Sequence, residues 1–140
     1  MGQLLEPLLP YLPYLSLVLR VAVGASLMVH GYPKLSGDGK KGAVEFMKSQ
    51  GVPGTAAVLS GLLEFFGGSF LVLGLLVPVV SFFFILQFGS IILLKGRKMK
   101  MKYIAPGKPN YEIDVTYLLL CLVLLVVGAG AFSLDGLVGL

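Results

Sequence analysis

Three ionisable residues interrupt otherwise apolar stretches of this sequence, and their side chains could support acid–base or ligand-binding chemistry. They are Arg20, His30 and Glu64. A charge inside a membrane-spanning helix costs about 2.5–3.5 kcal/mol on insertion scales, so such residues usually face protein or water. We therefore treat all three as candidate catalytic residues and as candidate ligand-binding residues.

Arg20 and Glu64 are predicted to lie at similar depths in two neighbouring helices. Arg20 is about eight residues, or roughly 12 Å, into the first apolar stretch. Glu64 is about nine residues, or roughly 14 Å, into the second stretch from its opposite end. Measured from the same side of the membrane, the two depths differ by less than the reach of an arginine side chain. We therefore expect an Arg20–Glu64 pair. Such a pair serves either as a structural staple or as a polar anchor for a ligand or a proton step.

His30 lies near the end of the first stretch, directly before Gly31. A histidine there can titrate near neutral pH or donate to a carbonyl or quinone oxygen. Alternatively, it bonds to free backbone carbonyls where the glycine ends the helix. Gln87 and Tyr117, in the third and fourth stretches, are further candidates for ligand binding. One histidine cannot supply both axial ligands of a bis-histidine haem, so neither intrinsic haem nor a metal site is expected.

The overall composition indicates that most of the surface faces a lipid bilayer. Of 140 residues, 56% are hydrophobic and 13% are charged, and the mean hydropathy is +0.92. A soluble domain has about a quarter of charged residues. The length suits one domain, residues 1–140.

Four stretches have, or nearly have, the length that a helix needs to cross the roughly 30 Å hydrocarbon core. They are residues 12–31, 55–75, 78–94 and 115–132. Pro78 suits the first turn of the third helix. We predict an all-α integral membrane four-helix bundle with short interfacial helices, one around residues 44–48 and one that Ser133 caps.

The distribution of basic residues predicts the orientation. Four of the eleven Lys and Arg residues lie in loop 32–54 and six in loop 95–114, and the eleventh is Arg20. The positive-inside rule places both loops in the cytoplasm, with both termini outside the plasma (cell) membrane. This topology also accounts for the net charge of +4, so no nucleic-acid partner is expected.

Phenylalanines in the second and third stretches give these helices a large aromatic surface. That surface could line a slot for a flat ring such as a quinone, or it could serve helix packing and lipid contact. The residues are Phe65, Phe66, Phe70, Phe82, Phe83, Phe84 and Phe88. Glycines among them, such as Gly67 and Gly68, allow close helix approach.

An ordered set of short segments extends over nearly the whole chain. The segments are Leu19–Gly24, Val29–Leu35, Gly51–Pro53, Glu64–Gly68, Leu73–Leu75, Tyr111–Glu112 and Gly128–Asp135. In order and spacing they resemble the DoxX family. The resemblance implies a four-helix membrane bundle and a link to redox metabolism, with relatives that include subunits of thiosulfate:quinone oxidoreductase. It also implies a polar set: Arg20, His30, Lys34, Glu64, Tyr111, Glu112, Ser133 and Asp135.

These features lead to the expectation of a small subunit of a membrane oxidoreductase that passes electrons from thiosulfate or another reductant to quinone. Arg20 and Glu64 would hold the head group, and His30 would assist proton transfer. The sequence contains no obvious redox centre, so quinone or a partner's cofactor would carry the electrons. The alternatives are an accessory or assembly subunit of a larger respiratory complex and a small-solute transporter. Expected partners are the bilayer and other membrane or peripheral subunits, or further copies of the chain.

Overall fold

The computed structural model describes residues 6–139, and all regular structure in that range is helical. The elements are η1 (Glu6–Tyr11), α2 (Leu12–Gly31), η2 (Tyr32–Lys34), α3 (Gly37–Ser49), α4 (Thr55–Leu62), η3 (Leu63–Gly67), α5 (Gly68–Leu73), α6 (Val77–Leu93), η4 (Leu94–Lys98), α7 (Glu112–Val127) and α8 (Leu134–Val138). The predicted all-α class is confirmed for these residues.

Three continuous helical runs are long and apolar enough to cross a membrane. They are Glu6–Lys34, Thr55–Leu73 and Val77–Lys98. The first contains α2, whose bounds match the predicted span, and the second ends at Gly74, whose φ of +70° stops the helix. The third places Pro78 in its first turn, where a proline costs no hydrogen bond.

The fourth expected span differs from the prediction. Helix α7 covers Glu112–Val127, 16 residues, rather than 115–132. It ends because Gly128 has a φ of +73°, and Gly130 has a φ of +75°. The Ser16 hydroxyl donates to the Gly128 carbonyl at 2.8 Å, which holds this non-helical segment against α2. Helix α8 then begins after Ser133, as expected, and the Ser133 hydroxyl accepts the Gly136 N–H at 3.0 Å.

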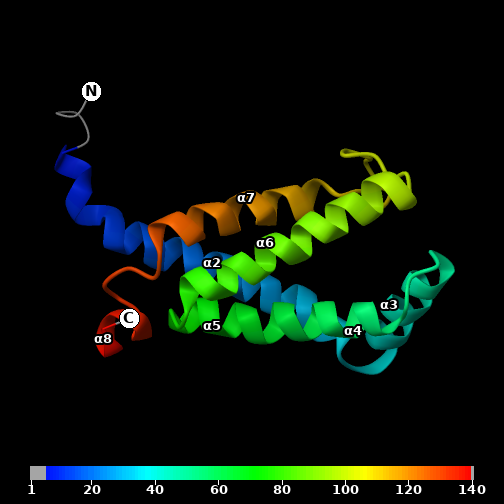
Figure 1. The fold of residues 1–140 in the computed structure, drawn as a ribbon, viewed down its shortest axis with the longest axis horizontal. Coiled ribbons are helices and arrows are strands. Elements are labelled where there is room, and N and C mark those ends of the chain that lie inside the picture. The colour runs from blue at the N-terminus through cyan, green and yellow to red at the C-terminus, as the bar shows by residue number, and fades with distance from the viewer. Residues whose placement is uncertain (1–5, 140) are drawn as a thin grey trace.

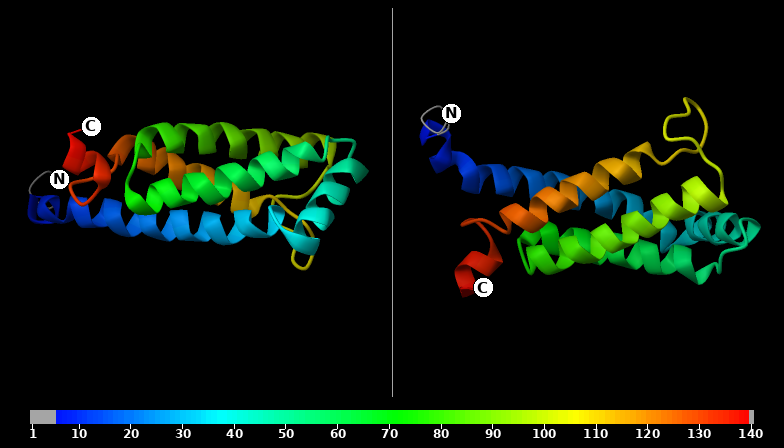
Figure 2. Two further views of the ribbon diagram at one scale, coloured as in Figure 1. Left: turned by 90° about the horizontal axis from the view of Figure 1, so that it is seen from below. Right: turned by 45° about the horizontal axis from the view of Figure 1, so that its top comes forward.

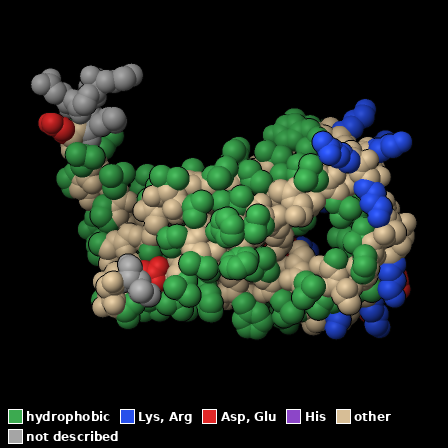
Figure 3. All heavy atoms as spheres, viewed as in Figure 1, with side chains coloured by type: hydrophobic (Ala, Val, Ile, Leu, Met, Phe, Trp, Pro, Cys, Tyr) green, Lys and Arg blue, Asp and Glu red, His purple; other side chains and the backbone are tan. Residues whose placement is uncertain are grey.

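The helices form two antiparallel hairpins, in which α2 packs along α4–α5 and α6 packs along α7 (Figure 1). One end of the bundle carries η1, the α5–α6 turn and α8, and we call it the terminal end (Figure 2). The opposite end carries α3 and the loop between η4 and α7. Lysine and arginine side chains gather there, so we call it the basic end (Figure 3). Toward the basic end, α6 moves away from α4 (Figure 1).

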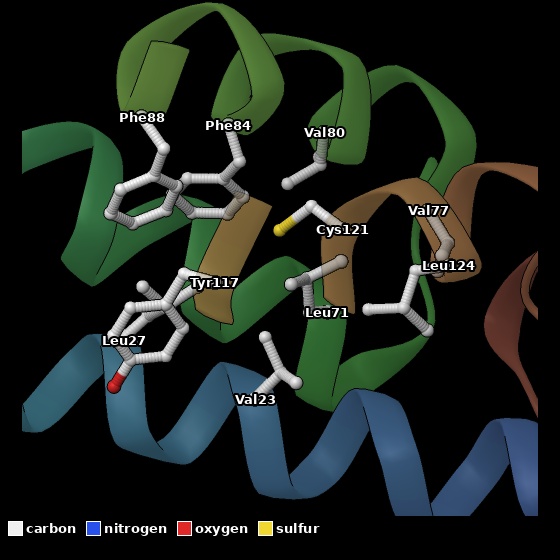
Figure 4. Packing of buried hydrophobic residues seen from close by; sticks show 10 residues of the cluster. All are labelled: Val23, Leu27, Leu71, Val77, Val80, Phe84, Phe88, Tyr117, Cys121 and Leu124. Atoms are coloured by element: carbon white, nitrogen blue, oxygen red, sulfur yellow. The ribbon is translucent and has the colours of Figure 1, made fainter. Parts of the chain in front are cut away.

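An apolar core joins the two hairpins (Figure 4). It consists of Val23, Leu27, Leu71, Val77, Val80, Phe84, Phe88, Tyr117, Cys121 and Leu124. A close crossing of α2 and α5 supports it: a Cβ added to Gly24 would lie 2.5 Å from the Gly68 carbonyl oxygen. The predicted close approach at Gly68 is thus confirmed, and any side chain at Gly24 would push these helices apart. The core fixes the frame on which the polar residues are placed.

Candidate functional site

Glu64 is the centre of a polar network toward the basic end, and its side chain is almost fully buried, with the residue 2% exposed. Lys34 Nζ donates to its two carboxylate oxygens at 2.8 and 2.6 Å. The Ser60 hydroxyl and the Gln87 amide donate to Glu64 Oε1 at 2.9 and 2.8 Å. Charge-assisted bonds of this kind are about twice as strong as neutral ones. We call Lys34, Ser60, Glu64 and Gln87 the Glu64 cluster.

Local geometry explains why these side chains meet. Ser60 and Glu64 are four residues apart, so they share one face of their helix. Gly31 lets α2 approach that face, since a Cβ there would lie 2.8 Å from Glu64 Cβ. The short helix η2 then brings Lys34 back over the carboxylate, and Gln87 reaches it from the other hairpin.

The expected Arg20–Glu64 pair is wrong. Arg20, which is 1% exposed, donates to the carbonyls of Leu71 and Val72 at 3.3 and 3.0 Å and to that of Phe132. Leu71 is seven residues beyond Glu64, or about 10 Å along the helix axis. The two residues were predicted to lie at similar depths. In the structure, Arg20 binds groups near one end of the bundle, whereas Glu64 binds groups toward the basic end.

Asp135 completes a second polar cluster at the terminal end. Its carboxylate accepts the backbone N–H groups of Leu76 and Val77 at 2.7 and 3.1 Å, which caps the start of α6. Its own N–H donates to the Gly74 carbonyl at 3.0 Å. We call Arg20 and Asp135, with the α5–α6 turn that they bind, the terminal cluster. Its charged groups bind main-chain atoms, which is the pattern of a structural staple.

His30 and Tyr117 lie together, apart from the Glu64 cluster. The exposed His30 ring meets the Tyr117 ring edge-on, with centroids 5.9 Å apart. The Tyr117 hydroxyl is hydrogen-bonded to Ser26, and its ring stacks on Phe88 at 5.2 Å. Among the residues that the structure describes, neither side chain is hydrogen-bonded to Glu64. Of the five predicted site residues, only Glu64 and Gln87 therefore meet in one network.

A second buried ion pair lies near the Glu64 cluster and was not predicted. Lys95 Nζ donates to Asp114 Oδ2 at 2.7 Å and to the Asn110 carbonyl at 3.4 Å, and Asp114 is 6% exposed. Lys95 was expected only as one of the basic residues of loop 95–114. The pair could have been inferred from the sequence, because a basic residue follows one predicted helix and an acidic residue lies in the first turn of the next, antiparallel helix.

Two hollows adjoin these charges; Figure 3 shows the molecule hollowed near the basic end. A cavity of about 220 Å³ touches both ion pairs and is covered by α3. A larger, mainly apolar groove of about 540 Å³ lies between α4 and α6, and Gln87 is part of its wall. Both are lined by Met47, Ser60 and Ile91. The buried Gln87 Oε1 has no hydrogen-bond partner within residues 6–139. In the same range, no group of three or more His, Cys, Asp or Glu side chains is placed to hold a metal.

The fold and the site define a helical membrane protein with a buried charged network beside an apolar groove. The chain belongs to the DoxX family, whose model matches residues 15–96, a range that contains the whole Glu64 cluster.

Two curated relatives cover most of the chain. One, named "Putative oxidoreductase CatD", from Bacillus subtilis (strain 168), is 32% identical over 86% of this chain and 84% of its own length. Another, "Inner membrane protein YphA" from Escherichia coli (strain K12), is 30% identical over 88% of this chain and 89% of its own. No solved structure matches the chain significantly.

Proposed function

We propose that this chain is a quinone-binding membrane subunit of an oxidoreductase, and that the Glu64 cluster holds the head group. The observation that carries the proposal is Gln87, which lines the apolar groove and whose buried Oε1 has no hydrogen-bond partner within residues 6–139. A buried acceptor without a partner costs about 1–3 kcal/mol. A ligand hydroxyl that donates to it would recover that free energy, and a quinol carries such a hydroxyl.

The shape of the groove suits an amphipathic ligand. Its volume of about 540 Å³ lies in the range of about 300–1,000 Å³ that is typical of small-molecule sites. Most of its lining is apolar, from residues such as Leu59, Leu63 and Phe83, and would take an isoprenoid tail. Its polar lining includes Ser60 and Gln87, both hydrogen-bonded to Glu64. A ring oxygen placed there would contact groups that Glu64 and Lys34 polarise.

The membrane topology belongs to the same proposal. Helix α7 serves as the fourth crossing, since 16 residues span about 24 Å and a bilayer thins to match a short helix. The basic end faces the cytoplasm, because nearly all Lys and Arg residues lie there. Loops 32–54 and 95–114 are then cytoplasmic, and the terminal end faces outward.

The electron donor lies outside this chain. In this proposal the protein binds quinone and orients it, and a partner or a soluble reductant supplies the electrons. The name of the Bacillus relative favours an oxidoreductase over a transporter. A sulfur compound such as thiosulfate is the donor that the family resemblance favours.

The first test is mass spectrometry of protein purified in mild detergent, which would identify bound lipid-soluble molecules and partner chains together. The second is a titration with a short-chain quinol, which we expect Gln87→Leu to weaken at least tenfold. Ser90→Ala is the matched control, because Ser90 lines the same groove but its hydroxyl donates to the Leu86 carbonyl at 2.8 Å. Purified protein that neither contains nor binds quinone would overturn the proposal and favour an accessory subunit.

A further inference from the structure

The cavity between the two buried ion pairs is not needed to hold a quinone head group and tail. It lies on the basic-end side of the Glu64 cluster, whereas the groove opens between α4 and α6. Lys34, Glu64, Lys95 and Asp114 are all the charged side chains that line it. They come from four different elements, so the chain brings two acids and two bases together around one space of about 220 Å³.

The helices that carry these charges depart from α-helical geometry at the cavity. Glu64 lies in the π-helical turn η3, and Lys95 lies in the π-helical turn η4. Turns of this kind are rare and are found frequently at functional sites, because they re-aim side chains. Here each π-helical turn presents one member of an ion pair to the cavity.

The two ion pairs are exposed to solvent in the same way. Their lysine side chains are the more accessible members, 31% exposed for Lys34 and 23% for Lys95. The carboxylates of Glu64 and Asp114 are 3% and 8% exposed. In both pairs the acid is thus more shielded from solvent than the lysine that it binds. The cavity holds room for several waters, because one water occupies about 30 Å³ and needs two to four polar partners.

We propose that this cavity is a hydrated path for protons between the basic end and Glu64, with Asp114 and Lys95 at its entrance. A proton from water at the basic end passes to the Asp114 carboxylate and, through the waters of the cavity, to Glu64. Asp114 returns to its ion pair with Lys95 after each transfer. Ala43, Phe46 and Met47 of helix α3 form an apolar part of the wall of this path.

The existence of this path does not depend on the proposed function. The use of the protons in quinone reduction does depend on it. Reduction of one quinone to quinol takes two electrons and two protons, and Glu64 is the acid nearest to the proposed head-group position. Protons for that reaction would come from the basic end rather than from the lipid-facing groove.

Hydration is tested by cysteine labelling in oriented vesicles with a membrane-impermeant, positively charged methanethiosulfonate. The wild-type chain gives the baseline, because its only cysteine, Cys121, is fully buried in the core. Ala57→Cys and Ala43→Cys place thiols on the cavity wall. Ala22→Cys is the matched control, because Ala22 is exposed on α2, where it faces lipid in the proposed topology. We expect labelling of both cavity variants, from the basic side only, and none of the control.

Proton movement is tested in oriented proteoliposomes that hold bound quinone, with a pH dye on the basic side. Dithionite is added only on the terminal side, because its own oxidation releases protons. We expect Asp114→Asn to slow proton uptake at least tenfold and to leave quinone affinity unchanged. Glu112→Gln, two residues away and exposed, should behave as wild type.

Three results would overturn the inference: cavity thiols that stay unlabelled in folded protein, labelling only from the terminal side, or normal proton uptake in Asp114→Asn. If the wild-type chain binds no quinone, the proposed function fails, and the labelling alone decides whether the path exists.

Discussion

The two polar clusters of this bundle use buried charge in different ways. In the terminal cluster, Arg20 and Asp135 bind backbone atoms of α5, of the α5–α6 turn and of the segment before α8. In the Glu64 cluster, side chains bind other side chains, and the buried Gln87 Oε1 has no partner among residues 6–139. Arg20 lines neither the groove nor the cavity at the basic end. Bonds to the main chain hold a fold in place, whereas a network of side chains can rearrange around a ligand.

The largest expected effect on stability is at Arg20. Arg20→Met would remove the side-chain donor of three carbonyls, of which that of Leu71 still accepts the Gly74 N–H, and would remove the cation that interacts with Asp135, at a cost of about 3–5 kcal/mol in the free energy of unfolding. Denaturant titration of the purified protein in detergent measures this cost. Arg97→Met, at an exposed arginine of the basic end, should change it by less than about 0.5 kcal/mol. Equal stability of the two variants would contradict the assignment of Arg20 as a staple.

A smaller effect is expected at the α5–α6 turn. Gly74 has a φ of +70°, and a Cβ there would lie 2.3 Å from Arg20 Nη1 and 2.6 Å from Ser133 Cβ. Gly74→Ala therefore combines backbone strain of about 1–2 kcal/mol with an overpacking cost of about 1–3 kcal/mol. Gly107→Ala isolates the strain, because Gly107 has a φ of +69° and nothing within 4 Å. If both substitutions lower stability equally in the same titration, Gly74 does not pack tightly on the terminal cluster.

Much of the helical frame could be predicted from the sequence, because apolar length and helix-ending residues are local signals. The bounds of α2 and the starts of α4 and α6 follow from such signals. The end of α7 was missed, because the apolar run continues through residues 128–132 while the backbone does not. Glycines with positive φ at positions 128 and 130 turn the chain so that the Phe132 carbonyl meets Arg20.

The pairing of charges could not be predicted from depth alone. A depth estimate locates a Cα atom, but long side chains extend several ångströms from it toward either end. Lys34 was assigned to a loop. In the structure, however, η2 continues α2 by one turn, and the Lys34 ammonium group contacts Glu64. Lys95 reached Asp114 in the same way. Matching acids with bases at the same end of neighbouring helices would have found Lys95 and Asp114, but not Lys34 and Glu64, because Glu64 lies in the middle of its helical run.

Quinol titration of Glu64→Gln tests the contrast between the clusters most directly. The substitution keeps the shape of the side chain but removes the charge that orients Lys34 and Gln87. Because the Lys34 side chain is 31% exposed and can be hydrated, we expect a stability loss of about 2 kcal/mol or less. The same protein should bind quinol at least tenfold more weakly than wild type. Unchanged affinity, or a stability loss as large as that of Arg20→Met, would show that Glu64 is a staple as well.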